Sequence, residues 1–360
     1  MPLMPDQIDD LVETVLDTFI EQAAERWVDI TQTLQRFVFV ERLMKDNGKY
    51  KWPLDGGPQF RFEVQVAGIK TARHSELYDK DVYAVADIMK SVKRPWTKLT
   101  CNFEYDVDEE VFSETRNRIV NYLGAREHAM YNDLFGLCEQ DMWTKPATDN
   151  ETPRPPDGIP AWVVKSATAA FGFNGANPAG YSSGIGLDSN TFVNWRNGTF
   201  TFVLVDDNDC LKKLAEAYTK TEFRSPDPNW DKQLDRGAYR WEMYTTYAWI
   251  DEYQRLAKRS NDNIGNDMGK YRVDAKFMGV DIVWVPAFDS DATLASYDSS
   301  DPIYGIDWRV FKWAFDKRAV MRRTKPLEIA GQHTVRAVHI DNWGQFGCLN
   351  RRCNFVGYRV

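Results

Sequence analysis

One stretch, from Asp106 to Trp143, limits more than any other what this chain can fold into. Mostly apolar side chains recur in it at steps of three and four residues, which places them on one face of a helix. They are Val111, Thr115, Ile119, Tyr122, Leu123, Met130, Leu134, Leu137 and Cys138. Asp106 is the expected N-cap, with Glu109 completing a capping box. Such a helix would be about 50 Å long at about 1.5 Å per residue. It predicts a flat, extended molecule, and the alternative is a long helix within an ordinary α/β enzyme.

A second amphipathic helix is predicted near the start of the chain, from Pro5 to Phe37. Trp27 belongs to its apolar face, which is too wide for a strict coiled-coil seam. The opposite face begins with acidic residues, among them Asp10, Glu13 and Asp17. A helix of this kind either closes the core of its own chain or docks on a neighbouring molecule, and both readings stay open.

A half-exposed strand is predicted from Phe60 to Val66, where apolar and polar residues alternate strictly. The polar segment from Ala67 to Asp81 suits the tip of a hairpin, and Val82 to Thr100 resumes extended character. These segments carry little apolar mass, and an isolated two-stranded arm is only marginally stable in water. We therefore expect the arm to lie on another molecule, most simply another copy of the same chain.

Shorter elements follow the long helix. We expect a short helix after Asp209 and a third helix from Tyr239 to Leu256. Extended segments are expected at Lys276 to Val285, Trp308 to Phe315, Thr334 to Ile340 and Cys348 to Tyr358.

Composition narrows the class of function. The chain has 360 residues, 43% of them hydrophobic, and a net charge of −8 with a pI near 5.2, so it is no general nucleic-acid binder. No apolar run approaches the roughly 20 residues needed to span a bilayer, and the start lacks the pattern of a signal peptide. We therefore expect folding in a cytoplasm, with the five cysteines reduced.

Candidate catalytic and metal-binding patterns are weak. Gly180 to Gly184 matches the G-x-S-x-G pattern around Ser182, but a nucleophile elbow needs a strand before the serine and a helix after it, and neither is expected here. His333 and His339 are the only plausible bases for such a hydrolase. Cys348 and Cys353 lack a second pair of zinc ligands, so packing is the favoured role for both. No cofactor and no metal are expected.

A resemblance to a known family rests on several short segments of the sequence. They are Gly57-Pro58-Gln59-Phe60, Gly279 to Pro286, Asp301 to Trp308, Met321 to Leu327, Gln332 to Arg336 and Asn350 to Asn354. With the order of elements along the whole chain, they resemble the major capsid proteins of tailed bacteriophages, which have the Hong Kong 97-type fold. This resemblance explains the long helix, the unsupported hairpin and the lack of an evident active site.

The resemblance implies an α+β fold with four structural parts. Residues 1–45 would be the N-terminal arm, 46–98 the extended hairpin loop, 99–216 with 301–345 the peripheral domain containing a spine helix at 106–143, and 217–300 with 346–360 the axial domain.

The implied function is structural rather than enzymatic. Many copies would assemble as pentamers and hexamers into the icosahedral head of a phage around double-stranded DNA. The implied partners are further copies of the chain, a scaffolding protein, a portal, decoration proteins where they exist, and packaged DNA in non-specific contact, with no membrane. The chain would be located in the virion after assembly in the host cytoplasm. An encapsulin-type nanocompartment shell is the alternative within the same fold, and a serine hydrolase using Ser182 is a remote one.

Charge adds a hypothesis about contacts between copies. The segment from Arg309 to Arg359 is strongly basic, whereas the helix at the start of the chain is acidic. We expect the two surfaces to meet between copies, because complementary charge fixes register; basic residues facing DNA or solvent are the alternatives. The expected contact residues are Asp10, Glu13, Asp17, Trp27, Arg61, Glu63, Lys70, Arg73, Arg322, Arg323, Arg351 and Arg352.

Overall fold

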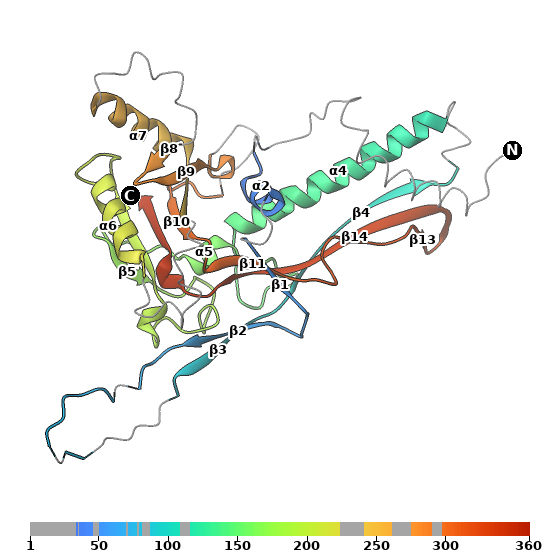
Figure 1. Ribbon diagram of the computed structural model, residues 1–360. Helices are drawn as coiled ribbons and strands as arrows, with labels where there is room; N and C mark the ends of the chain where they lie inside the picture. Colours follow the sequence, from blue (N-terminus) through green and yellow to red (C-terminus); the bar gives the residue numbers. More distant parts are fainter. Residues whose placement is uncertain are drawn as a thin grey trace.

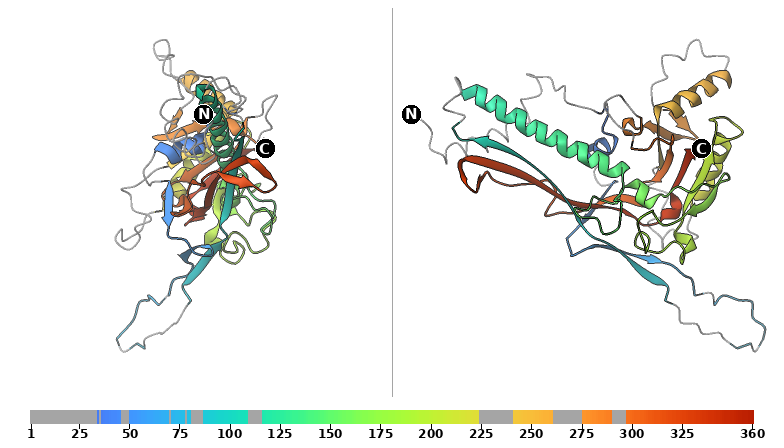
Figure 2. Two further views of the ribbon diagram at one scale, coloured as in Figure 1. Left: turned by 90° about the vertical axis from the view of Figure 1, so that its right-hand side faces the viewer. Right: turned by 180° about the vertical axis from the view of Figure 1, so that it is seen from behind.

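The chain forms an elongated molecule with two long projections. The computed structural model describes residue 34 and residues 36–45, 50–69, 71–77, 79–80, 87–108, 116–223, 241–260, 275–289 and 297–360. Figure 1 shows a body of sheet and helices from which a long helix and a pair of long strands extend to one side and a thin hairpin to the other. Figure 2 shows from behind that helix and hairpin leave the body in different directions. Most of the predicted first helix, including Asp10, Glu13, Asp17 and Trp27, lies outside the described residues, as does Lys70.

The first sheet has six strands and is built on β14 (Gln332–Cys348), which is 17 residues long. One edge of β14 pairs antiparallel with β4 (Thr97–Asp106). Its other edge pairs with β13 (Leu327–Ile329), β12 (Arg322–Arg323) and β11 (Phe311–Asp316), and β1 (Lys51–Leu54) adds to β11 in parallel. We expected residues 46–98 to form the hairpin loop alone, but β1 belongs to this sheet.

The long helix α4 (Arg116–Trp143) lies along β4 and β14 (Figure 1). Its end at Trp143 is the predicted one, but the predicted start at Asp106 is wrong. Asp106 is the last residue of β4 and pairs with Val335, and its carboxylate accepts hydrogen bonds from the backbone N–H of Asp108 and the hydroxyl of Thr334. The same polar residue that suits an N-cap here ends a strand.

The hairpin consists of β2 (Phe60–Gln65) and β3 (Met89–Arg94), paired antiparallel from Phe60 opposite Arg94 to Gln65 opposite Met89. The predicted alternation is confirmed, because Phe60 and Phe62 are buried, whereas Arg61, Glu63 and Gln65 are exposed. At its base, the Phe60 ring lies 5.5 Å from Trp52 and 6.0 Å from Trp96 between centroids. Beyond this aromatic contact the hairpin leaves the body (Figures 1 and 2).

The second sheet has seven strands in the order β5-β6-β15-β10-β7-β9-β8. Their bounds are β5 (Gly172–Gly175), β6 (Asn197–Phe202), β7 (Trp241–Thr245), β8 (Ala275–Phe277), β9 (Val280–Trp284), β10 (Ile303–Asp307) and β15 (Phe355–Arg359). Helices α6 (Cys210–Thr221) and α7 (Tyr247–Ser260) pack against it. We placed β5, β6 and β10 in the part that contains α4, but they belong to this second sheet.

Two further sequence predictions need correction in this region. Trp241 and Tyr244 were expected on the third helix, but they lie in β7, and the helix begins only at Tyr247. The expected final strand from Cys348 to Tyr358 is interrupted, because β14 ends at Cys348 and the short helix η8 (Arg351–Cys353) precedes β15. In both places the buried residues would suit a helix as well as a strand. The hydrophobic pattern therefore could not distinguish a helix from a strand there.

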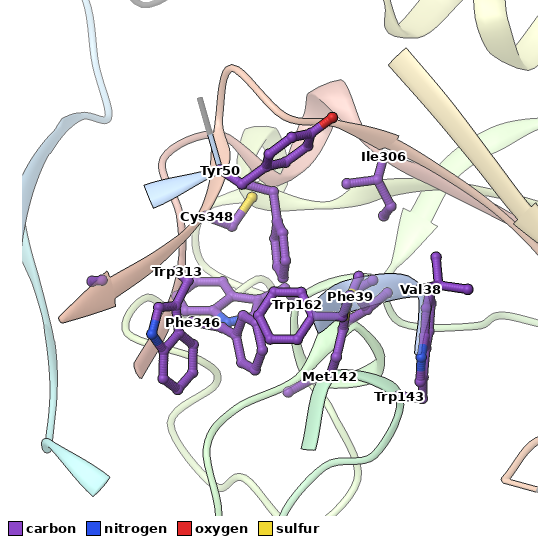
Figure 3. Packing of buried hydrophobic residues seen from close by; sticks show 14 of the residues in the cluster. Val38, Phe39, Tyr50, Met142, Trp143, Trp162, Ile306, Trp313, Phe346 and Cys348 are labelled. Carbon is purple, nitrogen blue, oxygen red and sulfur yellow. The ribbon is translucent and has the colours of Figure 1, made fainter. Parts of the chain in front are cut away.

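The main core lies where the carboxyl end of α4 meets strands of both sheets. Helices α2 (Val38–Lys45) and α5 (Ile159–Trp162) and the short helix η7 (Pro286–Phe288) close around it. The Trp143 ring lies 5.2 Å from Tyr244 and 4.9 Å from Phe288 between centroids. Figure 3 shows Phe39 of α2 among Trp162, Trp313 and Phe346. The carboxyl end of the long helix is thus anchored in this core, and Leu123, Met130 and Leu134 of the same helix are buried in the same cluster along the first sheet.

Candidate assembly surfaces

The hairpin arm is exposed wherever the structure describes its tip. All described residues from Ala67 to Lys80 are exposed, including Ile69 and Leu77, the latter with 84% of its surface open. The few polar contacts of the arm are local: Arg73 pairs with Asp79 at 2.5 Å and Arg61 with Glu63 at 3.1 Å, both on the surface. Exposed ion pairs of this kind contribute about 0–1 kcal/mol. The arm therefore exposes two large apolar side chains that no described part of the chain covers.

A buried carboxylate attaches the N-terminal part of the chain to the long helix. Glu139 of α4 accepts hydrogen bonds from the backbone N–H groups of Phe39 at 2.8 Å and Val40 at 3.3 Å, which are at the start of α2. Its other oxygen accepts from the indole N–H of Trp143 at 2.8 Å. Glu139 thus acts as the cap of α2 from another helix, which satisfies N–H groups that a helix leaves unpaired. No local sequence pattern indicates this role, because the partners are about 100 residues apart.

Two buried carboxyl groups in this region should make the free energy of unfolding depend on pH. Burial raises the pKa of Glu139 to about 7 and that of the neighbouring Asp141 to about 7, and Asp141 Oδ2 has no hydrogen-bond partner among the described residues. A pKa raised in the folded state means that the contribution to stability is full below about pH 4 and is lost as pH rises through about 7. We expect the free energy of unfolding to be greater at pH 5 than at pH 8 by on the order of 2–4 kcal/mol.

Urea unfolding of the unassembled chain at the two pH values measures this difference. The control is the double variant Glu139→Gln/Asp141→Asn, which titrates at neither position and should show a much smaller difference between pH 5 and pH 8. Equal stability of the original chain at both pH values would contradict the prediction.

The basic residues near the end of the chain are mostly paired within the same molecule. The ion pairs are Arg309–Asp307, Lys317–Asp55, Arg318–Asp316, Arg322–Asp341, Arg323–Glu127, Arg336–Glu328 and Arg359–Glu252. Partners such as Asp55 and Glu127 come from distant parts of the sequence, so the local excess of positive charge overstates the charge of the surface. Arg322 keeps 58% of its side chain exposed, while Arg323 is largely covered.

Arg351 was expected at a contact between copies, and the structure shows this to be wrong. Its side chain is fully buried and donates to the carbonyl oxygens of Trp162 and Ala176, to Ser189 Oγ and to Asn197 Oδ1 at 2.6–3.2 Å. Its neighbour Arg352 is partly exposed and lies over the ring of Phe173, 4.3 Å from the centroid. Both arginines lie in the short helix η8, which the sequence did not indicate. This helix turns Arg351 inward and Arg352 outward.

The hydrolase candidate has no catalytic arrangement around it. Ser182 is exposed in a turn, with neither a strand directly before it nor a helix after it, and within the described residues no hydrogen bond joins it to another side chain. His333 and His339 lie on β14. Gly180 and Gly184 have φ values of +88° and +70°, so the glycines of the motif are explained by the backbone of the loop.

The two neighbouring cysteines are packing groups. Cys348 and Cys353 are fully buried, and Cys348 Sγ accepts a hydrogen bond from Asn354 at 3.3 Å. Burial raises the pKa of Cys348 to about 12, so the thiol stays protonated and is a poor metal ligand. Among the described residues no group of three or more His, Cys, Asp or Glu side chains could hold a metal ion. None of the helices in these same ranges has both the length and the apolar character needed to cross a membrane.

Comparisons with known proteins find solved structures of similar fold, but no family model or curated protein that matches the sequence. No family model matches the chain, and the search of curated proteins found no match. Among solved structures, the capsid asymmetric unit of cyanophage A-1(L) aligns with a TM-score of 0.59 at 11% identity, covering 93% of this chain and 95% of that chain.

Two further structures align over similar lengths. The capsid of a native GTA particle gives a TM-score of 0.51 at 10% identity, covering 95% of this chain and 97% of that one. Gordonia phage Cozz gives 0.52 at 9% identity, covering 94% and 91%. The chain has the mixed α and β architecture of the Hong Kong 97-type capsid fold, as the sequence predicted.

Proposed function

We propose that this chain is a structural major capsid protein, many copies of which assemble as pentamers and hexamers into the icosahedral head of a phage around double-stranded DNA. The observation that carries the proposal is the hairpin arm, whose described residues from Ala67 to Lys80 are all exposed, in a chain with a capsid fold over more than nine-tenths of its length. Assembly would cover the arm with a neighbouring copy. The arm is too thin to form a hydrophobic core of its own. Contact area with neighbouring copies would stabilise it instead.

The parts of the molecule suit different contacts in such a shell. The six-stranded sheet and α4 would form the long peripheral part, and the seven-stranded sheet with α6 and α7 the axial part near the symmetry axes. The acidic helix expected at the start of the chain would meet exposed basic groups of a neighbour, such as Arg322, whose side chain is 58% exposed. Scaffolding, portal and decoration proteins and packaged DNA would be the further partners, and the virion the final location.

A shortened arm tests the proposal. Val66 and Ile88 adjoin the last paired residues of β2 and β3, and the N–H of Val66 donates to the carbonyl of Ile88 at 2.9 Å. Replacing residues 67–87 by Asn-Gly should therefore give a two-residue turn that the strands accept. We expect the unfolding free energy of the single chain to change by less than about 1 kcal/mol. Sedimentation should show megadalton particles for the original chain, produced with its scaffolding protein, and only small species for the shortened one.

The matched control keeps the length of the arm and removes only its two exposed apolar side chains, as Ile69→Ser/Leu77→Ser. It should assemble less completely than the original chain and more completely than the shortened one. Shells of normal size from the shortened chain would show that the arm is not a contact between copies. An original chain that stays a monomer under all assembly conditions would refute the proposed function itself.

A further inference from the structure

We propose that a buried network of ion pairs around Arg94 and Asp157 sets the direction in which the hairpin arm leaves the body, and thereby where its tip meets a second copy. Arg94 is the last residue of β3 and lies at the base of the arm, opposite Phe60. The inference rests on the proposed function, because the direction of the arm matters only if the arm reaches another molecule.

The centre of the network is a two-point contact. Arg94 Nε donates to Asp157 Oδ2 at 2.8 Å and Arg94 Nη2 to Asp157 Oδ1 at 3.0 Å, and both side chains are buried, with 4% and 0% of their surface exposed. A guanidinium joined to a carboxylate through two parallel bonds is fixed in orientation as well as in distance. The strand that carries Arg94 is therefore held at a defined angle to the loop that carries Asp157.

A second layer holds Asp157 and Arg94 in place. Arg154 donates to Asp157 at 2.8 Å, and the hydroxyl of Tyr181 donates to Asp157 Oδ1 at 2.7 Å. Asp149 pairs with Arg94 at 3.0 Å and with Arg154 at 3.2 Å. Two arginines thus share two carboxylates, and the Arg94 guanidinium also lies over the Tyr181 ring, 5.4 Å from its centroid. Buried charges are retained in proteins when each has its partners, and this cluster meets that condition.

The network is tied to the six-stranded sheet. The backbone N–H of Asp157 donates to Gln345 Oε1 at 2.7 Å, and Gln345 Nε2 donates to the carbonyl of Pro95 at 3.0 Å. Gln345 lies on β14, while Pro95 directly follows Arg94, so one side chain joins the loop, the sheet and the base of the arm. On the other side Gly186 lies against Val92, where no Cβ would fit. The end of β3 is thus fixed from three directions.

The position of this network at the base gives it a large effect at the tip. An extended chain spans about 3.3 Å per residue, so Arg73 lies up to about 45 Å from the Phe60–Arg94 pair. A rotation of about 10° at the base would then displace the tip by roughly 8 Å, which is wider than the tolerance of a specific contact. The aromatic contacts of Phe60 hold the base of the arm through hydrophobic burial, which does not depend on direction. The two-point contact of Arg94, by contrast, is directional.

The test measures the direction of the arm in single molecules. Spin labels on unnatural amino acids at the exposed positions Glu76 and Lys212 leave the native cysteines in place, and they report the distance from the tip to α6. We expect a narrow distance distribution for the original chain and one broadened by roughly 8 Å for Arg94→Met. Arg94→Lys keeps the charge but loses the two-point contact, so its distribution should also broaden. Arg61→Met removes an exposed ion pair of the same hairpin and should leave the distribution unchanged.

Assembly provides the second readout. Arg94→Met should yield roughly tenfold fewer closed shells than the original chain, equivalent to about 1.4 kcal/mol, and a wider range of particle sizes. If Arg94→Met does not fold, the paired variant Arg94→Met/Asp157→Asn removes both buried charges and is measured in its place. An unchanged distance distribution with normal shells would overturn the inference while leaving the proposed function intact. Failure of the original chain to form shells would instead overturn the proposed function.

Discussion

Replacing Arg351 with alanine is expected to lower the free energy of unfolding by about 4 kcal/mol. The guanidinium is fully buried and serves four acceptors that come from α5, from the segment after β5, from Ser189 and from β6. Burial lowers its pKa to about 10, so the group remains charged at neutral pH. Alanine would leave a cavity and several buried oxygens without donors, each of which costs about 1–3 kcal/mol.

Chemical denaturation of the unassembled chain measures this loss. Arg351→Lys should recover less than half of it, because a single ammonium cannot reach acceptors that lie on several sides. Arg322→Ala is the control, since it removes an arginine that is mostly exposed, and it should cost less than about 1 kcal/mol. If Arg351→Ala unfolded at the same denaturant concentration as the original chain, the role assigned to this buried arginine would be wrong.

Replacing Gly158 with alanine should destabilise the chain by about 3 kcal/mol through overpacking. A Cβ at this position would overlap the carbonyl oxygens of Asp141 and Thr144 and lie 2.6 Å from that of Met142, all at the carboxyl end of α4. The backbone of Gly158 has a φ of −65°, which any residue can adopt, so the cost arises from the close approach alone. The variant would push α5 away from the anchored end of the long helix.

Gly136→Ala provides a control of opposite sign for Gly158→Ala. Gly136 lies within α4 and a Cβ there would meet nothing within 4 Å, so alanine should raise stability by about 1 kcal/mol through its higher helix propensity. Thermal unfolding of the two variants side by side would show opposite shifts of the midpoint. Similar behaviour of both would mean that the segment around Gly158 moves aside at little cost.

The sequence predicted those parts of the fold that depend on local pattern. The alternation in Phe60 to Val66 predicted β2, because one face of that strand is buried and the other exposed. The end of α4 at Trp143 was also predicted, since Pro146 follows closely. The start of α4 was wrongly placed at Asp106, because β4 and the turn after it contain Asp106 and Asp108, which suit a strand end as well as a helix cap.

Contacts between distant segments could not be read from the sequence. Glu139 and the start of α2, or Arg94 and Asp157, are 63–100 residues apart, and nothing in either local pattern marks the other as a partner. The same reason explains the error at Arg351. A run of arginines near the end of the chain indicates positive charge, but which of them turn inward depends on η8 and on carbonyl groups from other elements. The proposed contacts between copies remain predictions for this reason.

The pairing within the six-stranded sheet has a consequence for biosynthesis. Strand β1 joins β11, some 260 residues later, and β4 joins β14 at a separation of about 230 residues. Contacts this remote in sequence form slowly, because a long loop must close before any of them is gained. The ribosome must therefore have produced almost all of the chain before its earliest strands find their places. Until then the edges of β1 and β4 stay unpaired, which leaves the unfinished chain prone to aggregate with others.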